Sequence, residues 1–284
     1  MNTEKRILVA DSGSTKTNWC YFTDGKQIQF TTYGANPFFR NTPDLVKEWS
    51  ASPVNDMRGQ MTHVFFYAAG VINEEKALVI RKALQVFFPE AEAIVQSDLL
   101  AAAHATLGTQ SGIACILGTG SNSCLYNGKE ITDHVPPLGF ILGDEGSGAV
   151  LGRQLVGDFL KKAMPEDLRQ VFKNKFPLEY SELMNRVYRS EKPNMFLAGF
   201  VPFLKEHISH EYCVSLVQTA FDLFIARNVF QYKNYKVQTI SFAGSVAYHF
   251  QEQLISVFIK RNLTLGKIIK EPVTDLLKYH LKQN

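Results

Sequence analysis

Residues 9–22 read VADSGSTKTNWCYF, and residues 115–127 read CILGTGSNSCLYN. Both stretches begin with an apolar segment typical of a buried strand, continue through a turn of Gly, Ser and Thr, and end in a second apolar segment. Similarity of this kind at a separation of about 105 residues indicates a repeated structural unit. We therefore expect two related domains, each built around a strand, a small-residue turn and a returning strand.

The composition is that of a globular protein. At roughly 150 residues per domain, 284 residues suit two domains. Hydrophobic residues make up 45% and charged residues 20%, which excludes a disordered chain. Thirty basic and 27 acidic residues give a net charge of +3, too weak to favour a nucleic-acid partner. The apolar runs are too short to span a membrane, and no secretory leader pattern precedes the first strand, so we expect a cytoplasmic protein without a membrane partner.

The four cysteines, Cys20, Cys115, Cys124 and Cys213, form no CxxC pair. We expect them to be reduced and buried, although Cys115 and Cys124 could face each other across a hairpin. Hairpin turns are predicted at Asp24-Gly25 and Asn127-Gly128.

Strands and helices alternate along the rest of the chain, which predicts an α/β fold. A helix is expected to begin near residue 42, with Thr42 as N-cap and Pro43 in its first turn. From Asp144 to about residue 232 the spacing of apolar residues is mostly helical. Further strands are predicted at 27–33, 63–69, 93–95, 112–117 and 237–242, and further helices at 73–88, from 98, at 246–261 and from 272.

The turn in residues 11–17, DSGSTKT, has the features of an anion site. Backbone N–H groups of a turn of small residues can converge on a phosphate, with the Ser14 and Thr15 hydroxyls as further donors and Lys16 as a positive charge. Asp11, at the end of the strand, could hold a hydrated Mg²⁺ beside such a phosphate. The alternative is an ordinary hairpin that carries a lysine. The sequence GxxxxGK[ST] of a Walker A loop is absent.

The second turn, Gly118-Thr119-Gly120-Ser121, has the same small residues in the repeated unit. Two such turns could bind a polyphosphate from both sides. A Rossmann fingerprint is not supported, because Ser123 stands where its third glycine is required.

Three later features could also carry chemistry. Asp98 lies where a strand is expected to end and a helix to begin, so it is either a helix-capping carboxylate or a general base. The segment 143–148, GDEGSG, has more glycines than a helix start requires and would allow a ligand to approach the backbone. Gly244 and Ser245 follow a predicted strand, where a glycine would leave room for an adenine ring.

Taken in order, DSGSTKT, LGTGSN, PPLGFILGDEGSG and ISFAGSVA resemble the motifs of the actin-like ATPase superfamily, which contains sugar kinases, Hsp70 and actin. Within it the chain is most similar to the BadF/BadG/BcrA/BcrD ATPase family and its N-acetylglucosamine kinase members. The resemblance covers nearly the whole chain. It implies two ribonuclease H-like lobes with a nucleotide cleft between them. One difference is that the family usually has DGGGTKT, whereas Ser12 and Ser14 replace two glycines here.

The resemblance implies a role for particular residues. Asp11 would lie near Mg²⁺, Asp98 would be the catalytic base, and Gly244 and Ser245 would lie near the adenosine. The phosphate-binding residues would be Gly13, Ser14, Thr15, Lys16, Gly118, Thr119, Gly120 and Ser121. The sugar-binding residues would be Asn36, in the loop Gly34-Ala35-Asn36, with Asn122, Gly139 and Asp144.

The expected activity is that of an ATP- and Mg²⁺-dependent kinase of an amino sugar, most directly N-acetylglucosamine. The alternative is a nucleotide-driven switch or activator that acts on a partner protein. The lobe boundaries are expected at 1–108, joined by a final helix at 272–284, and at 109–271, with a helical insertion at about 150–232. The apolar faces of that insertion suggest a homodimer.

Overall fold

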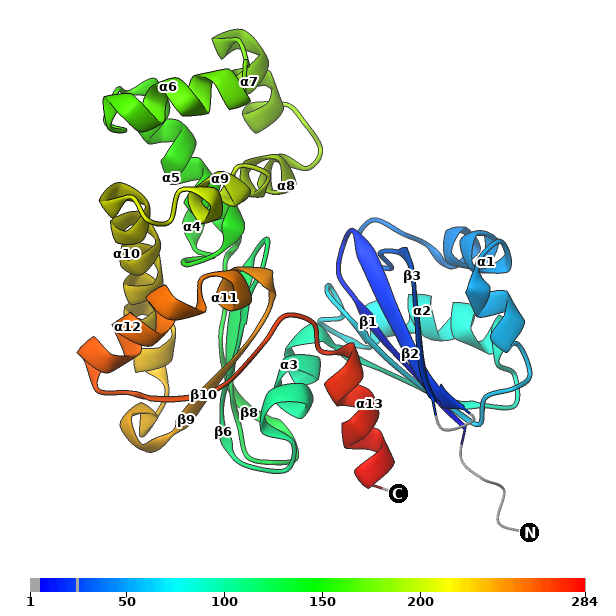
Figure 1. Cartoon of the computed structure of the whole chain (residues 1–284). Helices are drawn as coiled ribbons and strands as arrows, with labels where there is room; N and C mark the ends of the chain where they lie inside the picture. Colours follow the sequence, from blue (N-terminus) through cyan, green and yellow to red (C-terminus); the bar gives the residue numbers. More distant parts are fainter. Residues whose placement is uncertain (1–5, 24–25, 284) are drawn as a thin grey trace. The chain divides into compact units, whose positions relative to one another are not determined.

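Each half of the chain builds one five-stranded sheet (Figure 1). The computed structural model describes residues 6–23 and 26–283, so the turn expected at Asp24-Gly25 lies outside the described residues. The chain divides into unit 1, residues 1–109 with 271–284, and unit 2, residues 110–270. The strands are β1 Ile7–Ser12, β2 Lys16–Thr23, β3 Lys26–Tyr33, β4 His63–Ala68, β5 Glu92–Ser97, β6 Gly112–Leu117, β7 Ser121–Tyr126, β8 Ile131–Val135, β9 Thr239–Ala243 and β10 Thr264–Ile269.

The two sheets have the same topology. In unit 1 the order is β3-β2-β1-β4-β5, with β1, β2 and β3 antiparallel and β4 and β5 parallel to β1. In unit 2 the order is β10-β9-β6-β7-β8, with the antiparallel meander β6-β7-β8 and the parallel strands β9 and β10. The repeat seen in the sequence is therefore a repeat of a whole sheet, and the predicted two-lobed α/β class is confirmed.

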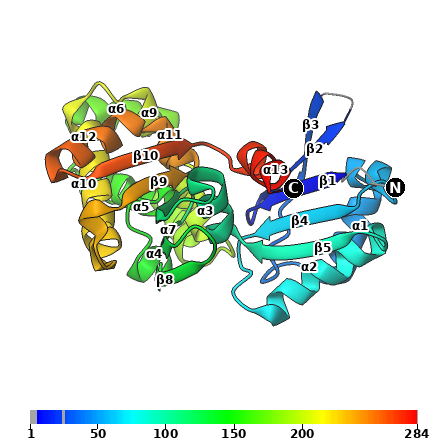
Figure 2. The ribbon, with the colours of Figure 1, turned by 90° about the horizontal axis from the view of Figure 1, so that it is seen from below.

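The sheet of unit 1 carries helices on both faces (Figure 2). Alternate residues of β4 point to opposite faces: Val64 and Phe66 pack on the side of α1 and α2, while Tyr67 contacts α3 and α13 on the other. The helices of unit 1 are α1 Thr42–Ser50, α2 Glu74–Phe87, α3 Asp98–Leu107 and α13 Val273–Lys282, with a short 3-10 turn at Pro53–Met57.

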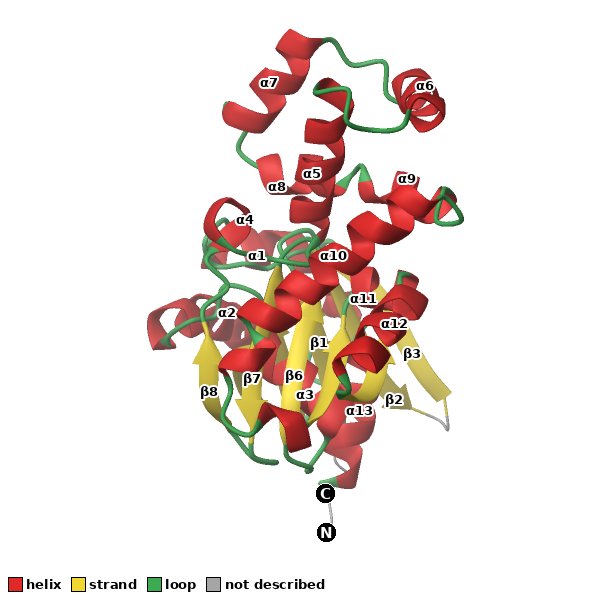
Figure 3. Cartoon of the chain, turned by 90° about the vertical axis from the view of Figure 1, so that its left-hand side faces the viewer, coloured by secondary structure: helices red, strands yellow, loops and turns green. Residues whose placement is uncertain are grey.

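Unit 2 contains a large helical segment in which α6 and α7 lie beyond the end of its strands (Figure 3). Its core joins Leu117 of β6 and Phe242 of β9 to aromatic residues of α10, among them Phe221 and Phe224. The helices are α4 Gly139–Leu142, α5 Gly148–Leu160, α6 Glu166–Lys175, α7 Tyr180–Tyr188, α8 Pro193–Ala198, α9 Val201–Glu206, α10 Glu211–Arg227, α11 Ser245–His249 and α12 Gln251–Arg261, with 3-10 turns at Val229–Gln231 and Tyr235–Val237.

Among the described residues, one helical stretch, 211–231, is long and apolar enough to cross a membrane by length and composition alone. Its apolar side chains include Cys213, Val217 and Phe221, all fully buried against the rest of unit 2. The stretch has the features of a core helix, whose hydrophobicity serves packing within the unit.

Local structure departs from the sequence prediction at several helix starts. Asn41, not Thr42, is the N-cap of α1, because its side chain accepts a hydrogen bond from the Asp44 N–H at 2.9 Å. The Thr42 hydroxyl instead donates to the carbonyl of Val79 in α2. Likewise α5 begins at Gly148 after the N-cap Ser147, four residues later than expected. Strands β8 and β10 were not predicted, because each is short and partly exposed at a sheet edge.

A buried tyrosine and two histidines join α13 to the rest of unit 1. The Tyr67 hydroxyl forms hydrogen bonds with His104 Nδ1 at 2.8 Å and with His280 Nε2 at 2.9 Å. The hydroxyl hydrogen can be donated to at most one of these nitrogens, so at least one of the two histidines donates its ring N–H to the tyrosine oxygen. Burial lowers the pKa of His104 to about 4 and that of His280 to about 3.

We expect His104 and His280 to make an unfavourable contribution to the stability of unit 1 in mild acid. Both histidine pKa values lie below the value of about 6.5 in an unfolded chain, so the unfolded state binds more protons as pH falls below 6.5. Each histidine should then lower the free energy of unfolding by about 2 kcal/mol at pH 5. Urea unfolding at pH 7 and pH 5 measures this. Going from pH 7 to pH 5, the free energy of unfolding of a His104→Gln/His280→Gln variant should change more favourably than that of the wild type, and the same change in both proteins would contradict the assignment.

Candidate active site

The first small-residue turn lies between β1 and β2 in unit 1. It is closed by a hydrogen bond from the Gly13 N–H to the Lys16 carbonyl at 2.9 Å, and residues 13–16 are exposed. Lys16 Nζ forms an ion pair with Glu271 Oε1 at 2.8 Å, and both side chains are nearly half exposed. An anion at this turn would therefore meet a lysine already paired with a carboxylate that the sequence analysis did not single out.

Two partly buried aspartates flank this turn. The pKa of Asp11 is raised to about 7, mainly by burial and also by the charges of Asp98 and Glu271, which outweigh the opposing charge of Lys16. Burial raises the pKa of Asp98 to about 6, offset in part by hydrogen bonding from the backbone of Leu99 and of Asp98 itself. Three acidic residues from β1, the start of α3 and the segment before α13 thus influence one another electrostatically.

This arrangement suits a hydrated cation better than a directly bound one. In the described part of the chain, no group of three or more His, Cys, Asp or Glu side chains is placed to hold a metal ion. Mg²⁺ keeps several waters and commonly binds through one or two carboxylates together with substrate phosphates. Asp11, with hard oxygen donors and neighbouring negative charges that a cation would offset, fits that role through water.

Asp98 is the first residue of α3 but does not cap it. The N-cap is Ser97, whose hydroxyl accepts a hydrogen bond from the Leu100 N–H at 3.2 Å. The capping interpretation of Asp98 therefore loses its main support. The raised pKa also differs from the ordinary aspartate value assumed from sequence, and it makes the ionised side chain a stronger base.

The loop 34–36 packs directly on the first turn. Asn36 is 7% exposed, its Nδ2 donates to the Ser14 hydroxyl at 2.8 Å, and its Oδ1 accepts from the Phe38 N–H at 3.0 Å. The amide keeps a second hydrogen and a second lone pair, so it can still bind a hydroxyl of a ligand. A Cβ on Gly34 would lie 2.4 Å from the Gly13 carbonyl oxygen, which explains why only glycine fits there.

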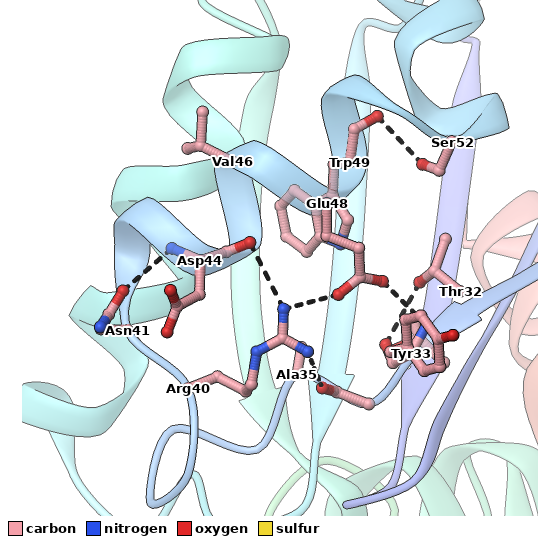
Figure 4. A network of polar contacts seen from close by, with 12 residues as sticks. Thr32, Tyr33, Ala35, Arg40, Asn41, Asp44, Val46, Glu48, Trp49 and Ser52 are labelled. Atoms are coloured by element: carbon pink, nitrogen blue, oxygen red, sulfur yellow. Dashed lines mark hydrogen bonds and ion pairs between the residues drawn. The ribbon is translucent and has the colours of Figure 1, made fainter.

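An ion pair fixes the other side of the same loop (Figure 4). Arg40 Nη2 lies 2.6 Å from Glu48 Oε2, and Glu48 Oε1 accepts from the Tyr33 N–H at 2.8 Å. Arg40 also donates to the Gly34 carbonyl at 3.5 Å. These side chains are mostly buried and connect α1 to both ends of the loop.

The second turn, in unit 2, is bound to the start of α5. The first N–H groups of the helix, those of Gly148 and Ala149, donate to the carbonyls of Gly118 and Thr119 at 2.8 and 3.0 Å. Asp144 Oδ1 accepts from the Ser121 N–H at 3.2 Å, and burial raises the pKa of Asp144. The segment 143–148 therefore supports the second turn. This close packing gives a structural reason for the glycines of the segment, which the sequence alone did not reveal.

The predicted sugar residues of unit 2 lie in two places. The Asp144 N–H donates to the carbonyl of Pro137, and Gly139 begins the exposed helix α4 between them. Asn122 lies on β7, where its Oδ1 accepts from the Ser123 N–H and contacts His134 Nε2, both at 2.9 Å. Asp144 thus contacts the second turn, while the side chain of Asn122 is held within the strand pair β7 and β8.

The adenosine motif and the second turn meet in one cavity. The backbone of Gly244 has φ +119°, and a Cβ there would lie 2.3 Å from the Leu117 carbonyl oxygen, so the two turns touch backbone to backbone. Beside them is a cavity of about 400 Å³. Its lining residues are Gly118, Thr119, Gly148, Ala198, Val201, Pro202, Lys205, Glu206, Ser245, Val246, His249 and Phe250.

This cavity includes residues that sequence reasoning missed. Lys205 and Glu206 come from α9 and His249 from α11, and Glu206 also forms an ion pair with Lys175. No motif marks them, because their position depends on how the helices of unit 2 pack. The four cysteines are all free and buried, as expected from their spacing.

Comparison with known proteins agrees with this geometry. No family model matches the chain, and no curated protein matches it. Among solved structures, the chain is similar to a putative N-acetylglucosamine kinase from Porphyromonas gingivalis, with 45% identity, a TM-score of 0.91, and coverage of 97% of this chain and 99% of that one.

Two more distant structures share the fold. A putative N-acetylglucosamine kinase from Chromobacterium violaceum has 17% identity and a TM-score of 0.74 over 97% of this chain and 98% of that one. A putative sugar kinase from Cytophaga hutchinsonii has 12% identity and a TM-score of 0.55 over 98% of this chain and 100% of that one.

Two sheets of one topology, each with a small-residue turn between its first two strands, give the two-lobed fold that the motifs of the sequence predicted. Identity of 45% over almost the full length of both chains is high enough to show which family this protein belongs to. The chain belongs to the same family of sugar kinases as the Porphyromonas gingivalis protein, in agreement with the sequence motifs.

Proposed function

We propose that this protein uses ATP to phosphorylate an amino sugar, with N-acetylglucosamine as the substrate. The observation that carries the proposal is the cavity of unit 2, where residues 118–119, 148 and 245 line one space although they are far apart in sequence. Its size and mixed lining suit an adenosine group. The names of the related structures support a sugar as acceptor.

In this mechanism Asp98 is the general base. It takes the proton from a sugar hydroxyl as that oxygen forms its bond to the γ-phosphorus. The bond from the γ-phosphorus to the bridging oxygen breaks, and ADP leaves with the electron pair. Donors of the two turns, Gly13 to Lys16 and Gly118 to Ser121, would stabilise the charge on the phosphates. Mg²⁺, when bound with the nucleotide, supplies further positive charge, and Asp11 would hold it through water.

We propose that Asn36, Asn122, Gly139 and Asp144 orient the sugar. The support differs among them. Asn36 has a free donor and acceptor at a nearly buried site, and Asp144 lies beside the phosphate turn. The roles of Asn122 and Gly139 are proposed from the family resemblance alone.

The test is a coupled assay of ADP release with N-acetylglucosamine, glucosamine, N-acetylmuramic acid and no sugar. We expect turnover to require a sugar and kcat/KM to be highest for N-acetylglucosamine, with mass spectrometry showing one added phosphate. NMR of the product identifies the modified hydroxyl. Equal ADP release with and without every sugar would contradict the proposal and favour a nucleotide-driven switch.

Replacing Lys16 with Ala should raise the KM for ATP more than the KM for the sugar. Its ammonium group lies on the turn proposed to bind phosphate, and removal of a charge-assisted contact typically costs about 1.5–3 kcal/mol, or roughly ten- to hundredfold in affinity. Steady-state kinetics with each substrate varied measures the difference. Lys129→Ala, on an exposed turn of unit 2, is the control, and equal effects of Lys16→Ala on both KM values would argue against a phosphate role.

We further propose that the protein is a cytoplasmic homodimer. Four buried free cysteines suit a reducing compartment. Exposed apolar side chains on the helical segment of unit 2 offer a dimer surface: Val171, Tyr180, Tyr188 and Leu223. Light scattering after gel filtration measures the mass, and a value near 32.0 kDa would show a monomer instead.

A further inference from the structure

The two serines that replace the family's usual glycines both bind the loop 34–36. The Ser12 hydroxyl is 1% exposed, accepts from the Ala35 N–H at 2.9 Å and forms a hydrogen bond with the Thr17 hydroxyl at 2.8 Å. The Ser14 hydroxyl accepts from Asn36 Nδ2 at 2.8 Å. With these contacts the first turn and the loop that carries Asn36 form one hydrogen-bonded element.

Backbone contacts make this element tight. The Gly34 N–H donates to the Thr15 carbonyl at 2.9 Å, and the Thr17 hydroxyl donates to the Tyr33 carbonyl at 2.9 Å. The Arg40–Glu48 pair holds the loop from the opposite side (Figure 4). A movement of the turn therefore has to move Asn36 as well.

Ser12 and Ser14 differ in what their hydroxyls can still do. The Ser12 hydroxyl is enclosed by partners and is a structural tether. Ser14 is exposed, and in the described part of the chain its hydroxyl has a contact only with the Asn36 amide, in which it is the acceptor. Its hydrogen therefore points to no protein acceptor and can be donated to a ligand at the turn.

We propose that the Ser14 hydroxyl is a positioning group that links the two substrates. It donates to a phosphoryl oxygen of the nucleotide and at the same time accepts from Asn36 Nδ2. A hydroxyl that donates to an anion becomes a better acceptor, so a bound nucleotide strengthens the contact to Asn36 and fixes the amide that faces the sugar. Nucleotide and sugar then bind with positive coupling, and this coupling is reciprocal.

This inference rests on the proposed function, so its test uses a readout that does not require turnover. The probe is the side-chain amide of Asn36, observed by ¹⁵N NMR and assigned with Asn36→Asp. Adding the non-hydrolysable analogue AMPPNP with Mg²⁺ should shift this resonance in the wild type. Ser14→Ala should abolish the shift, and Ser14→Thr, which keeps the hydroxyl, should restore it. Ser190→Ala, which removes an exposed hydroxyl just after α7 that donates to the Arg186 carbonyl, is the matched control.

Calorimetry gives the size of the coupling. We expect AMPPNP to tighten binding of N-acetylglucosamine about fivefold or more in the wild type and by less than twofold in Ser14→Ala. No shift of the Asn36 amide in the wild type, or a shift retained in Ser14→Ala, would overturn the proposal. The kinase proposal fails separately, through sugar-independent ADP release, and a Ser14-dependent shift in such a protein would still support the link between the turn and the loop.

Discussion

Asp98→Asn is expected to lower kcat by about 10²–10⁴-fold while the protein folds normally, because the amide cannot accept the proton of the sugar hydroxyl. The helix start is preserved, since Ser97 is the cap of α3. The measurement is kcat with saturating ATP and sugar, together with the thermal midpoint. ATP binding should survive, because Asp98 is not placed among the phosphate donors.

A matched control separates catalysis from helix capping. Ser97→Ala removes the cap and should cost about 1 kcal/mol of stability with a far smaller loss of turnover. A folded Asp98→Asn protein with near-normal kcat would contradict the role of base. It would also leave little reason to prefer a kinase over a switch.

The pH dependence adds a second check on Asp98. Only the ionised carboxylate can accept a proton, and its pKa is raised to about 6. The value of kcat/KM should therefore fall as pH drops below about 6, whereas an ordinary aspartate would keep it level to about pH 4.

Gly244→Ala should have the second largest effect. The backbone there has φ +119° and ψ 156°, a region that is essentially confined to glycine, and the added Cβ would lie 2.3 Å from the Leu117 carbonyl oxygen. Relief of that clash would push the adenosine motif away from the second turn. We expect the KM for ATP to rise at least about tenfold and stability to fall by about 1–3 kcal/mol.

Kinetics with varied ATP and urea unfolding measure both effects. Gly157→Ala is the control, because Gly157 lies inside α5 with nothing within 4 Å of an added Cβ. That substitution should be neutral or slightly stabilising. An unchanged KM for ATP in Gly244→Ala would contradict the proposal that this cavity binds the adenosine of the nucleotide.

The sequence predicted the fold class because its two turns occur in equivalent strands of a repeated sheet. Asp11 and Gly118 could be recognised because each belongs to a strand, a turn and a second strand that follow one another directly in the sequence. Glu271 could not be predicted, because its partner Lys16 is 255 residues away in sequence and the pair exists only once α13 packs on unit 1. The pKa of Asp98 was misjudged for a similar reason: its burial comes from elements that no motif identifies.

The contacts between the first turn and the loop 34–36, and the cavity residues on α9 and α11, could not be predicted from the sequence either. The turn DSGSTKT predicts phosphate binding, but the hydrogen bonds of Ser12 and Ser14 with Ala35 and Asn36 depend on how a distant loop returns to the turn. The residues of the adenosine cavity on α9 and α11 follow from helix packing rather than from periodicity.

The return of the final helix to unit 1 has a consequence for protein synthesis. Unit 2 is one continuous stretch, so its core needs no segment from outside residues 110–270. Unit 1 does need a distant segment, because Leu276, Leu277 and His280 of α13 fill the face of its sheet next to α3. The unit whose strands are synthesised first therefore needs, for its own core, a helix that is synthesised only after the whole of unit 2.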